Sequence, residues 1–370
     1  MRPATLEFVK QRFSEYYRKQ NLPAPSSLEQ REWGFAYLDA AAEIRMRRHM
    51  AFSDPLELSA YVRNMTPAHV YYSTAYYQTP SAPTMNEKRW AGADLIFDLD
   101  ADHIIRGSYT MMLERVREET VKLVGMLVDE LGFSRNHIRI AFSGGRGYHI
   151  HITDIAVRGW GSPERREVVD YVCGIGLDPA VMLAAGPRNG WRGRYADALR
   201  AHLLWIKGLD PAGAKDRLAG VPGVSKAAAG KFHAGLDALL EKSPEELLQN
   251  PVVRAIAAAP DFADRLRDAG ARADEPVTTD IKRLIRAPGS LHGGSGMRVV
   301  PLEIRDLADF DPLVDAVVFG DREVRVEMKA NFSTSLLGNT YTLKAGTAAV
   351  PEALAVFLCC RNMAEITGGA

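Results

Sequence analysis

Hydrophobic residues recur along the chain at two spacings, one typical of helices and the other of strands. Leu6, Val9 and Phe13 follow the helical period near the N-terminus. The same period runs through residues 109–131, and Gly132 then provides a natural stop. Both segments are therefore predicted to be amphipathic helices.

Alternation of apolar and polar residues predicts strands elsewhere. Over residues 93–100 the apolar side chains share one face, whereas Asp98 and Asp100 project from the other. Residues 138–142 and 148–152 also alternate, and the glycine-rich turn between them favours a β-hairpin.

The character of the sequence changes near residue 163. As far as residue 270, Ala, Leu, Lys and Glu dominate, strand patterns are lacking, and a capping signature at Ser243 marks one helix start. β character returns from Val277, and a final helix is predicted over residues 351–365.

These patterns predict an α+β fold in two parts. Residues 1–160 and 271–370 are expected to form one catalytic domain, in which mixed sheets are flanked by helices. Residues 161–270 are expected to form an α-helical insertion subdomain. The 370 residues suffice for such a core, and the shares of 46% hydrophobic and 25% charged residues are ordinary for a soluble globular protein.

The overall charge and the cysteines narrow the functional classes. The 46 basic residues balance 46 acidic ones, so nucleic acid would have to bind through local basic patches or a basic partner. The three cysteines, Cys173, Cys359 and Cys360, form no CxxC pair. Their small number and their spacing argue against a disulfide frame or a thiolate zinc site, and they favour a reducing compartment. No apolar run reaches the ~18 residues of a membrane span, and no signal-peptide core occurs, so neither membrane insertion nor export is expected.

Two aspartates end the strand predicted over residues 93–100. Because alternate side chains project to the same side, Asp98 and Asp100 can share divalent cations, as in two-metal phosphoryl transfer. Such pairs also occur on exposed strands that have no function. Here the pair follows the apolar residues 95–97, whose burial makes unpartnered acids costly. The pair is therefore a candidate metal site.

The turn of the predicted hairpin carries donors for an anion. Glycines within residues 143–147 let backbone N–H groups approach a phosphate. Ser143, Arg146 and His149 add a hydroxyl, a guanidinium and an imidazole to the same short segment. The alternative interpretation is a glycine-rich hairpin with incidental histidines.

A third cluster lies late in the chain, over residues 282–293. It concentrates four cationic or protonatable side chains in a chain of zero net charge: Lys282, Arg283, Arg286 and His292. Such groups suit a triphosphate or a template backbone. The sequence Pro-Gly-Ser-Leu-His-Gly within it is not expected of a simple solvated basic face, and Asp274 and Asp280 lie upstream.

Together the three clusters resemble the small catalytic subunit of archaeo-eukaryotic DNA primases, in its archaeal form. The resemblance covers nearly the whole chain and is specific in combination, although no single segment is. The further matching segments are residues 31–35, 48–52, 70–73, 92–103 and 310–316. The resemblance implies the primase catalytic fold and template-dependent synthesis of short RNA or DNA primers.

The resemblance also implies roles for individual residues. Asp98 and Asp100 match the metal-binding pair. Asp274 matches the third carboxylate, because it precedes His292 by eighteen residues, and Asp280 stays open as the alternative. The residues that match nucleotide phosphate contacts are Ser143, Arg146, His149, Arg286 and His292. Glu32 and Arg48 lie in a motif that borders the site, and Arg48 is included as a substrate-binding residue.

Cofactors and partners follow from the same resemblance. Two Mg²⁺ or Mn²⁺ ions are expected at the carboxylates, with nucleoside triphosphates as substrates and single-stranded DNA as template. A primase large subunit is the expected partner in a heterodimer, and the cytoplasm is the expected location. Many family members carry a zinc cluster of cysteine and histidine after the first carboxylate motif. Residues 104–119 contain no cysteine, so structural zinc is expected to be absent.

Two other classes of protein are compatible with the residues themselves. A two-metal hydrolase, such as a nuclease or phosphatase, would use the same carboxylates together with a water-activating group. A non-enzymatic RNA-binding module would carry exposed aromatic residues on its strands, whereas this central strand presents acids that repel phosphate unless metal intervenes. Metal-dependent binding of nucleoside triphosphates would separate a primase from the hydrolase.

Overall fold

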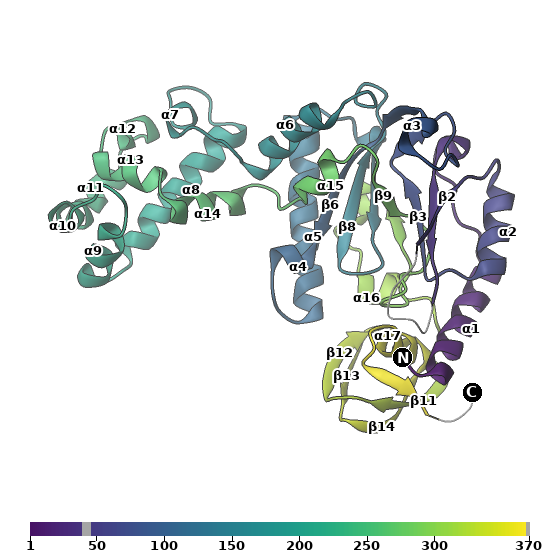
Figure 1. Ribbon diagram of the computed structural model, residues 1–370. Coiled ribbons are helices and arrows are strands. Elements are labelled where there is room, and N and C mark those ends of the chain that lie inside the picture. The colour runs from purple at the N-terminus through teal and green to yellow at the C-terminus, as the bar shows by residue number, and fades with distance from the viewer. Residues whose placement is uncertain (39–45, 368–370) are drawn as a thin grey trace. The chain divides into compact units, whose positions relative to one another are not determined.

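The computed structural model describes residues 1–38 and 46–367, which fall into two compact units (Figure 1). The first unit consists of residues 1–121, 133–166 and 273–370, and the second of residues 122–132 and 167–272. All the strands that the structure describes belong to the first unit. The fold is therefore α+β with many helices, as predicted, but the strand pairs that the structure describes are antiparallel, whereas mixed sheets were expected.

Two four-stranded antiparallel sheets form the centre of the first unit. One sheet has the strand order β2-β1-β3-β9 and the other the order β10-β7-β8-β6. The bounds of the first sheet are β1 (Trp33–Ala36), β2 (Met46–Met50), β3 (His69–Ser73) and β9 (Leu284–Arg286). The bounds of the second are β6 (Leu95–Asp100), β7 (Ile138–Phe142), β8 (Gly147–Ile152) and β10 (Val300–Leu302).

Smaller sheets and helices complete the first unit. The smaller sheets pair β4 (Ala75–Tyr77) with β5 (Trp90–Ala93), β12 (Phe332–Leu336) with β13 (Asn339–Leu343), and β11 (Glu323–Met328) with both β14 (Gly346–Pro351) and β15 (Ala364–Ile366). The helices are α1 (Pro3–Lys19), α2 (Pro55–Met65), α3 (Met85–Lys88), α4 (Ala101–Ile104), α15 (Glu275–Thr279), α16 (Pro312–Asp315) and α17 (Glu352–Cys360). Helix α17 is apolar and almost wholly buried, and it packs against α1 and the sheet of β11.

Two longer helices begin in the first unit and end in the second. They are α5 (Tyr109–Gly125), followed by a π-helical turn over Met126–Glu130, and α6 (Ser162–Cys173). The other helices of the second unit are α7 (Pro179–Met182), α8 (Gly190–Lys207), α9 (Pro211–Ala219), α10 (Lys226–Ala234), α11 (Leu236–Leu240), α12 (Pro244–Leu247), α13 (Pro251–Ala257) and α14 (Pro260–Ala269). Ser243 caps α12 in a capping box with Glu246, which confirms the signature seen in the sequence.

Strand β6 has the alternation that the sequence predicted. Leu95, Phe97 and Leu99 are completely buried, whereas Asp98 and Asp100 are partly exposed. β6 pairs with β8 in a register that places Asp98 opposite His149 and Asp100 opposite Gly147. The apolar face thus holds the strand in the core, and the acids face outward at its end.

A buried ion pair lies directly before β6. The guanidinium of Arg31 donates to the Asp94 carboxylate at 2.8 Å and to the Thr74 carbonyl at 2.6 Å, and it stacks 3.6 Å from the ring centroid of Tyr76. The Tyr76 hydroxyl donates to the same carboxylate at 2.7 Å. This network ties the chain before β1 to the start of β6. Removing one partner of such a buried pair typically costs about 3–5 kcal/mol.

The C-terminal segment differs from the sequence prediction. A helix was predicted over residues 351–365, but α17 ends at Cys360 and residues 364–366 form β15 beside β11. Asn362 adopts a left-handed φ of 59°, and the N–H of Met363 donates back to the carbonyl of Leu358 at 2.9 Å. This turn ends the helix and reverses the chain, as left-handed residues do at helix C-termini.

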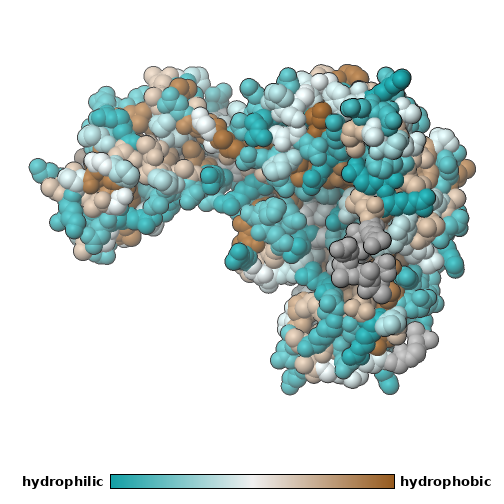
Figure 2. Space-filling view, viewed as in Figure 1, coloured by the Kyte–Doolittle hydropathy of each residue, from teal (hydrophilic) through white to brown (hydrophobic). Residues whose placement is uncertain are grey.

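The surface is largely hydrophilic on the face seen in Figure 2, where hydrophobic residues occur singly or in small groups. Among the residues that the structure describes, no helix combines the length and the apolar character needed to cross a membrane.

The register of β6 and β8 generates a prediction for Gly147. A Cβ at this position would lie 2.2 Å from the backbone oxygen of Leu99, which cannot move without disturbing β6. We expect Gly147→Ala to lower the free energy of unfolding by about 1–3 kcal/mol, the usual cost of overpacking. Urea unfolding measures the change. Gly159→Ala is the matched control, because a Cβ at Gly159 meets nothing within 4 Å. Equal stability of the two variants would contradict the prediction.

Candidate active site

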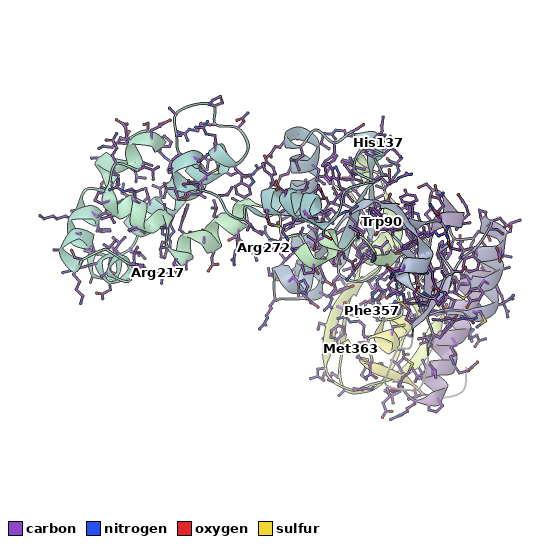
Figure 3. The ribbon with its side chains drawn as sticks, turned by 45° about the horizontal axis from the view of Figure 1, so that its top comes forward. Trp90, His137, Arg217, Arg272, Phe357 and Met363 are labelled. Atoms are coloured by element: carbon purple, nitrogen blue, oxygen red, sulfur yellow. The ribbon has the colours of Figure 1, made fainter. Side chains whose placement is uncertain are left out.

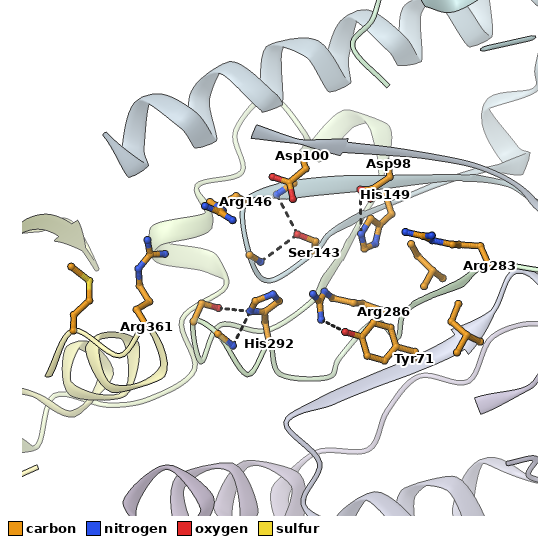
Figure 4. A pocket seen from close by; sticks show the side chains of 17 residues that line it. Tyr71, Asp98, Asp100, Ser143, Arg146, His149, Arg283, Arg286, His292 and Arg361 are labelled. Atoms are coloured by element: carbon orange, nitrogen blue, oxygen red, sulfur yellow. Dashed lines mark hydrogen bonds and ion pairs between the residues drawn. The ribbon is translucent and has the colours of Figure 1, made fainter. Parts of the chain in front are cut away.

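A pocket of about 770 Å³ opens beside the outward face of β6 (Figure 4). Seven of the nine predicted site residues line it: Asp98, Asp100, Ser143, Arg146, His149, Arg286 and His292. The sequence signals on β6, on the β7–β8 turn and on residues 286–292 therefore meet in one place. Asp274 and Arg48 are not among the lining residues.

The carboxylates on β6 repel one another. Burial, together with the charges of Asp100 and Asp274, raises the pKa of Asp98 from 3.8 to about 6, although the charges of Arg283 and Arg286 act in the opposite direction. A carboxyl group with such a pKa takes up a proton easily unless a cation stabilises its charge. A cation bound beside Asp98 would therefore stabilise the ionised form of this carboxyl group.

Asp274 lies beside the β6 pair, whereas Asp280 has a local role. The N–H of Asp274 donates to the backbone oxygen of Asp98 at 2.8 Å, and the charge of Asp274 acts on the Asp98 carboxyl group. The Asp280 carboxylate accepts a hydrogen bond from the N–H of Lys282 at 2.8 Å. Among the described residues, no three or more His, Cys, Asp or Glu side chains form a ready-made metal site.

Ser143 organises the glycine-rich turn. Its hydroxyl oxygen accepts hydrogen bonds from the N–H groups of Gly145 and Gly147, at 3.3 and 3.2 Å. Because the oxygen accepts in both bonds, its own O–H can still be donated to a ligand. Arg146, from the same turn, forms an ion pair with Asp102 at the start of α4. The turn is therefore held in shape by its own side chains.

His149 is buried beside Asp98 and lacks a partner on one nitrogen. Its Nε2 lies 3.6 Å from the Asp98 carboxylate, and its Nδ1 is the buried nitrogen that forms no hydrogen bond with the described residues. Burial lowers the pKa of His149 well below 6.5, so the ring is neutral near pH 7. A buried polar atom without a partner is costly and suggests that a ligand completes it.

His292 has a defined orientation and tautomer. The N–H of Gly294 donates to its Nδ1 at 3.1 Å, so a neutral ring carries its proton on Nε2. Burial lowers the pKa of His292 well below 6.5. Its Nε2 lies against Gly145, where a Cβ would approach to 3.1 Å. His292 therefore presents an N–H donor to the glycine-rich turn.

Arg286 is held by two side chains of β3. Its guanidinium donates to Nδ1 of His69 at 2.6 Å and to the hydroxyl of Tyr71 at 2.8 Å. Burial, followed by the charge of Arg286, lowers the pKa of His69 to about 3, so His69 is neutral and accepts this bond. Neither His69 nor Tyr71 was predicted as a site residue, although Tyr71 lies within a matching segment.

Glu32 and Arg48 form a separate cluster. The guanidinium of Arg48 donates to both carboxylate oxygens of Glu32, at 3.0 and 3.3 Å, and Nζ of Lys88 lies 3.5 Å from the same carboxylate. Glu32 and Lys88 are both fully buried. These ion pairs connect the segment directly before β1 with β2 and α3. Arg48 is not among the residues that line the pocket.

Other pocket residues gave little or no signal in the sequence. Arg283 lies in the basic cluster, but no role was assigned to it. Arg361 and Met363 come from the end of α17 and the segment after it, far from every motif. Isolated residues of this kind are recognised only when the fold brings them to the pocket.

An acidic strand that faces a glycine-rich turn, arginines and neutral histidines is typical of enzymes that transfer phosphoryl or nucleotidyl groups. The family model described as DNA primase small subunit matches residues 97–304. The DNA primase small subunit PriS of Methanosphaerula palustris is 56% identical over 377 residues, covering 100% of both chains. Those of Methanoregula boonei and Methanocorpusculum labreanum are 56% and 53% identical, covering 99–100% of this chain and 100% of theirs.

The chain therefore belongs to the DNA primase small subunit family, which confirms the resemblance seen in the sequence. Members of this family are nucleotidyltransferases of DNA replication, and this chain is a primase subunit with the catalytic function of primer synthesis. Of the classes compatible with the residues, the findings favour this one over a hydrolase or an RNA-binding module.

Buried histidines make the stability of the first unit dependent on pH. Burial lowers the pKa of His151, on β8, from 6.5 to about 4. As pH falls from 6.5 to about 4, His151 binds a proton in the unfolded chain but not in the folded chain, so this histidine contributes a decrease in the free energy of unfolding. We expect His151→Asn to remove up to about 3 kcal/mol of this decrease. Urea unfolding across this range measures it, and an unchanged slope would contradict the prediction.

Proposed function

We propose that this chain synthesises short primers on single-stranded DNA by two-metal nucleotidyl transfer, with Asp98, Asp100 and Asp274 holding two Mg²⁺ or Mn²⁺ ions. The main support for this proposal is the set of side chains that line one pocket. Acids on β6 face arginine and histidine donors contributed by the β7–β8 turn and by residues 286–292. A metal-bound triphosphate matches both sides, because cations suit the acids and phosphate oxygens suit the donors.

The carboxylates fit hard divalent cations. Burial, together with the charges of Asp100 and Asp274, raises the pKa of Asp98, and positive charge between the carboxylates would favour its ionised form. Mg²⁺ is usually held by one or two carboxylates together with waters and substrate phosphates, so a closed protein cage is not required. When bound, such ions supply Lewis-acid activation of a 3′-hydroxyl and neutralise charge on the triphosphate.

The proposed phosphate contacts are positioned before the substrate arrives. Asp102 holds Arg146, His69 and Tyr71 hold Arg286, and the Gly294 N–H sets the tautomer of His292. Ser143 offers a hydroxyl proton, and His149 offers the nitrogen that lacks a partner. Donors fixed in this way lose little entropy on binding, and their dipoles need not reorient during the reaction.

We also propose how the chain divides into domains. Residues 1–160 and 271–370 would form the archaeo-eukaryotic primase catalytic fold, with residues 161–270 as the helical insertion subdomain. The confinement of the described strands to the first unit supports this division. A primase large subunit is the proposed partner, because the relatives are named small subunits, and the cytoplasm is the proposed location.

Removal of the β6 carboxylates tests the proposed metal site. Asp98→Asn combined with Asp100→Asn removes the negative charge but keeps the side-chain shape. We expect nucleotide incorporation on a single-stranded DNA template to fall about 10³-fold or more, because transition-state charge is no longer neutralised. Thermal unfolding should show a folded protein. Undiminished synthesis by the folded variant would refute the assignment.

A matched pair of substitutions tests the third carboxylate. Asp274→Asn should reduce Mg²⁺-dependent incorporation strongly, because Asp274 lies beside Asp98. Asp280→Asn should leave most of the activity, because Asp280 accepts a local bond from Lys282. The same template-dependent assay over a range of Mg²⁺ concentrations compares the two. The reverse order of effects would move the third metal ligand to Asp280.

A further inference from the structure

One wall of the pocket comes from a part of the chain outside the three motif clusters. Arg361 and Met363 line the pocket, although they follow α17 near the end of the chain. Figure 3 shows Phe357 and Met363 close together in this C-terminal region. The wall is built by the turn that ends α17, the same turn that the sequence prediction placed inside a helix.

The Arg361 guanidinium is oriented by aromatic rings. Its central carbon lies 4.6 Å from the ring centroid of Tyr109 and 5.1 Å from that of Phe357. The hydroxyl of Tyr109 donates to the carbonyl of Gly145 in the glycine-rich turn. Stacking of this kind positions a guanidinium without neutralising its charge. Tyr109 therefore connects Arg361 to the turn that carries Arg146.

The charge of Arg361 is not balanced by a neighbouring acid. Arg146 is paired with Asp102, and Arg286 is bonded to His69 and Tyr71. Within residues 1–38 and 46–367, no carboxylate lies within ion-pair distance of Arg361, and its Nε is buried without a hydrogen-bond partner. A half-buried guanidinium with unused donors can bind a phosphate through charge-assisted hydrogen bonds.

The position of Arg361 indicates which phosphate it would bind. In Figure 4, Arg361 lies at one end of the pocket and Asp98 and Arg283 lie toward the other, with Arg146 and His292 between them. The proposed metal site fixes the reacting phosphate at the carboxylates. A triphosphate that extends past Arg146 and His292 therefore points its last phosphate toward Arg361.

We propose that Arg361 binds the terminal phosphate of the incoming nucleoside triphosphate. The inference rests on the proposed function, because the carboxylates set the direction of the triphosphate. Arg361 would be a nucleotide-binding residue from the C-terminal segment. The affinity of the protein for a nucleotide would then depend on how many phosphates that nucleotide carries. A nucleoside monophosphate has no β- or γ-phosphate to place beside Arg361.

Equilibrium binding of ATP and AMP to the full chain, in Mg²⁺, tests the proposal. Arg361→Met keeps an apolar stem against Tyr109 and Phe357 but removes the charge. ATP should bind about tenfold more weakly, which corresponds to one charge-assisted contact, whereas AMP should bind as before. Arg361→Lys should recover part of the loss. Arg325→Met, an exposed arginine on β11, is the matched control and should change neither affinity.

The other outcomes are equally decisive. Unchanged ATP affinity, or equal losses for ATP and AMP, would each overturn the inference. Arg146→Met separates this failure from failure of the proposed function. If Arg146→Met weakens ATP binding and Arg361→Met does not, the proposed function stands without Arg361. If neither variant changes ATP binding, the proposed phosphate site is wrong as well.

Discussion

The antiparallel register of β6 against β8 is the constraint on which the pocket depends. It sets Asp98 opposite His149 and Asp100 opposite Gly147, so the acids and the glycine-rich turn meet at one end of the sheet. Because side chains alternate along a strand, a slip of one residue would turn both acids into the core. The complete burial of the opposite face, and the close approach of Gly147 to the oxygen of Leu99, fix the register.

The side chains that line the pocket give it an acidic side and a side of hydrogen-bond donors. On the side of β6, burial together with the charges of Asp100 and Asp274 raises the pKa of Asp98 to about 6. On the other side, arginines are held by neighbours, and His149 and His292 are kept neutral by burial. A neutral imidazole donates a hydrogen bond without adding a full charge. The proposed metal–triphosphate complex would match both sides of the pocket, because cations suit the acids and phosphate oxygens suit the donors.

The sequence predicted the local elements well, because short-range patterns determine them. The alternation over residues 93–100 and the hairpin around residues 143–147 are both present in the structure. The prediction of a helix over residues 351–365 was wrong at its C-terminal end. The apolar residues there are compatible with a buried helix, but they are equally compatible with the strand β15 beside β11. Arg361 and the support of Arg286 by His69 and Tyr71 could not be predicted, since they arise from contacts between segments far apart in the sequence.

The most direct test of the account is a crystal structure of the chain with Mn²⁺ and a non-hydrolysable nucleoside triphosphate, using anomalous scattering to locate the metal. We expect two Mn²⁺ peaks among Asp98, Asp100 and Asp274, with the phosphates against Arg146 and His292. Manganese bound elsewhere, or a triphosphate bound away from the β7–β8 turn, would contradict it.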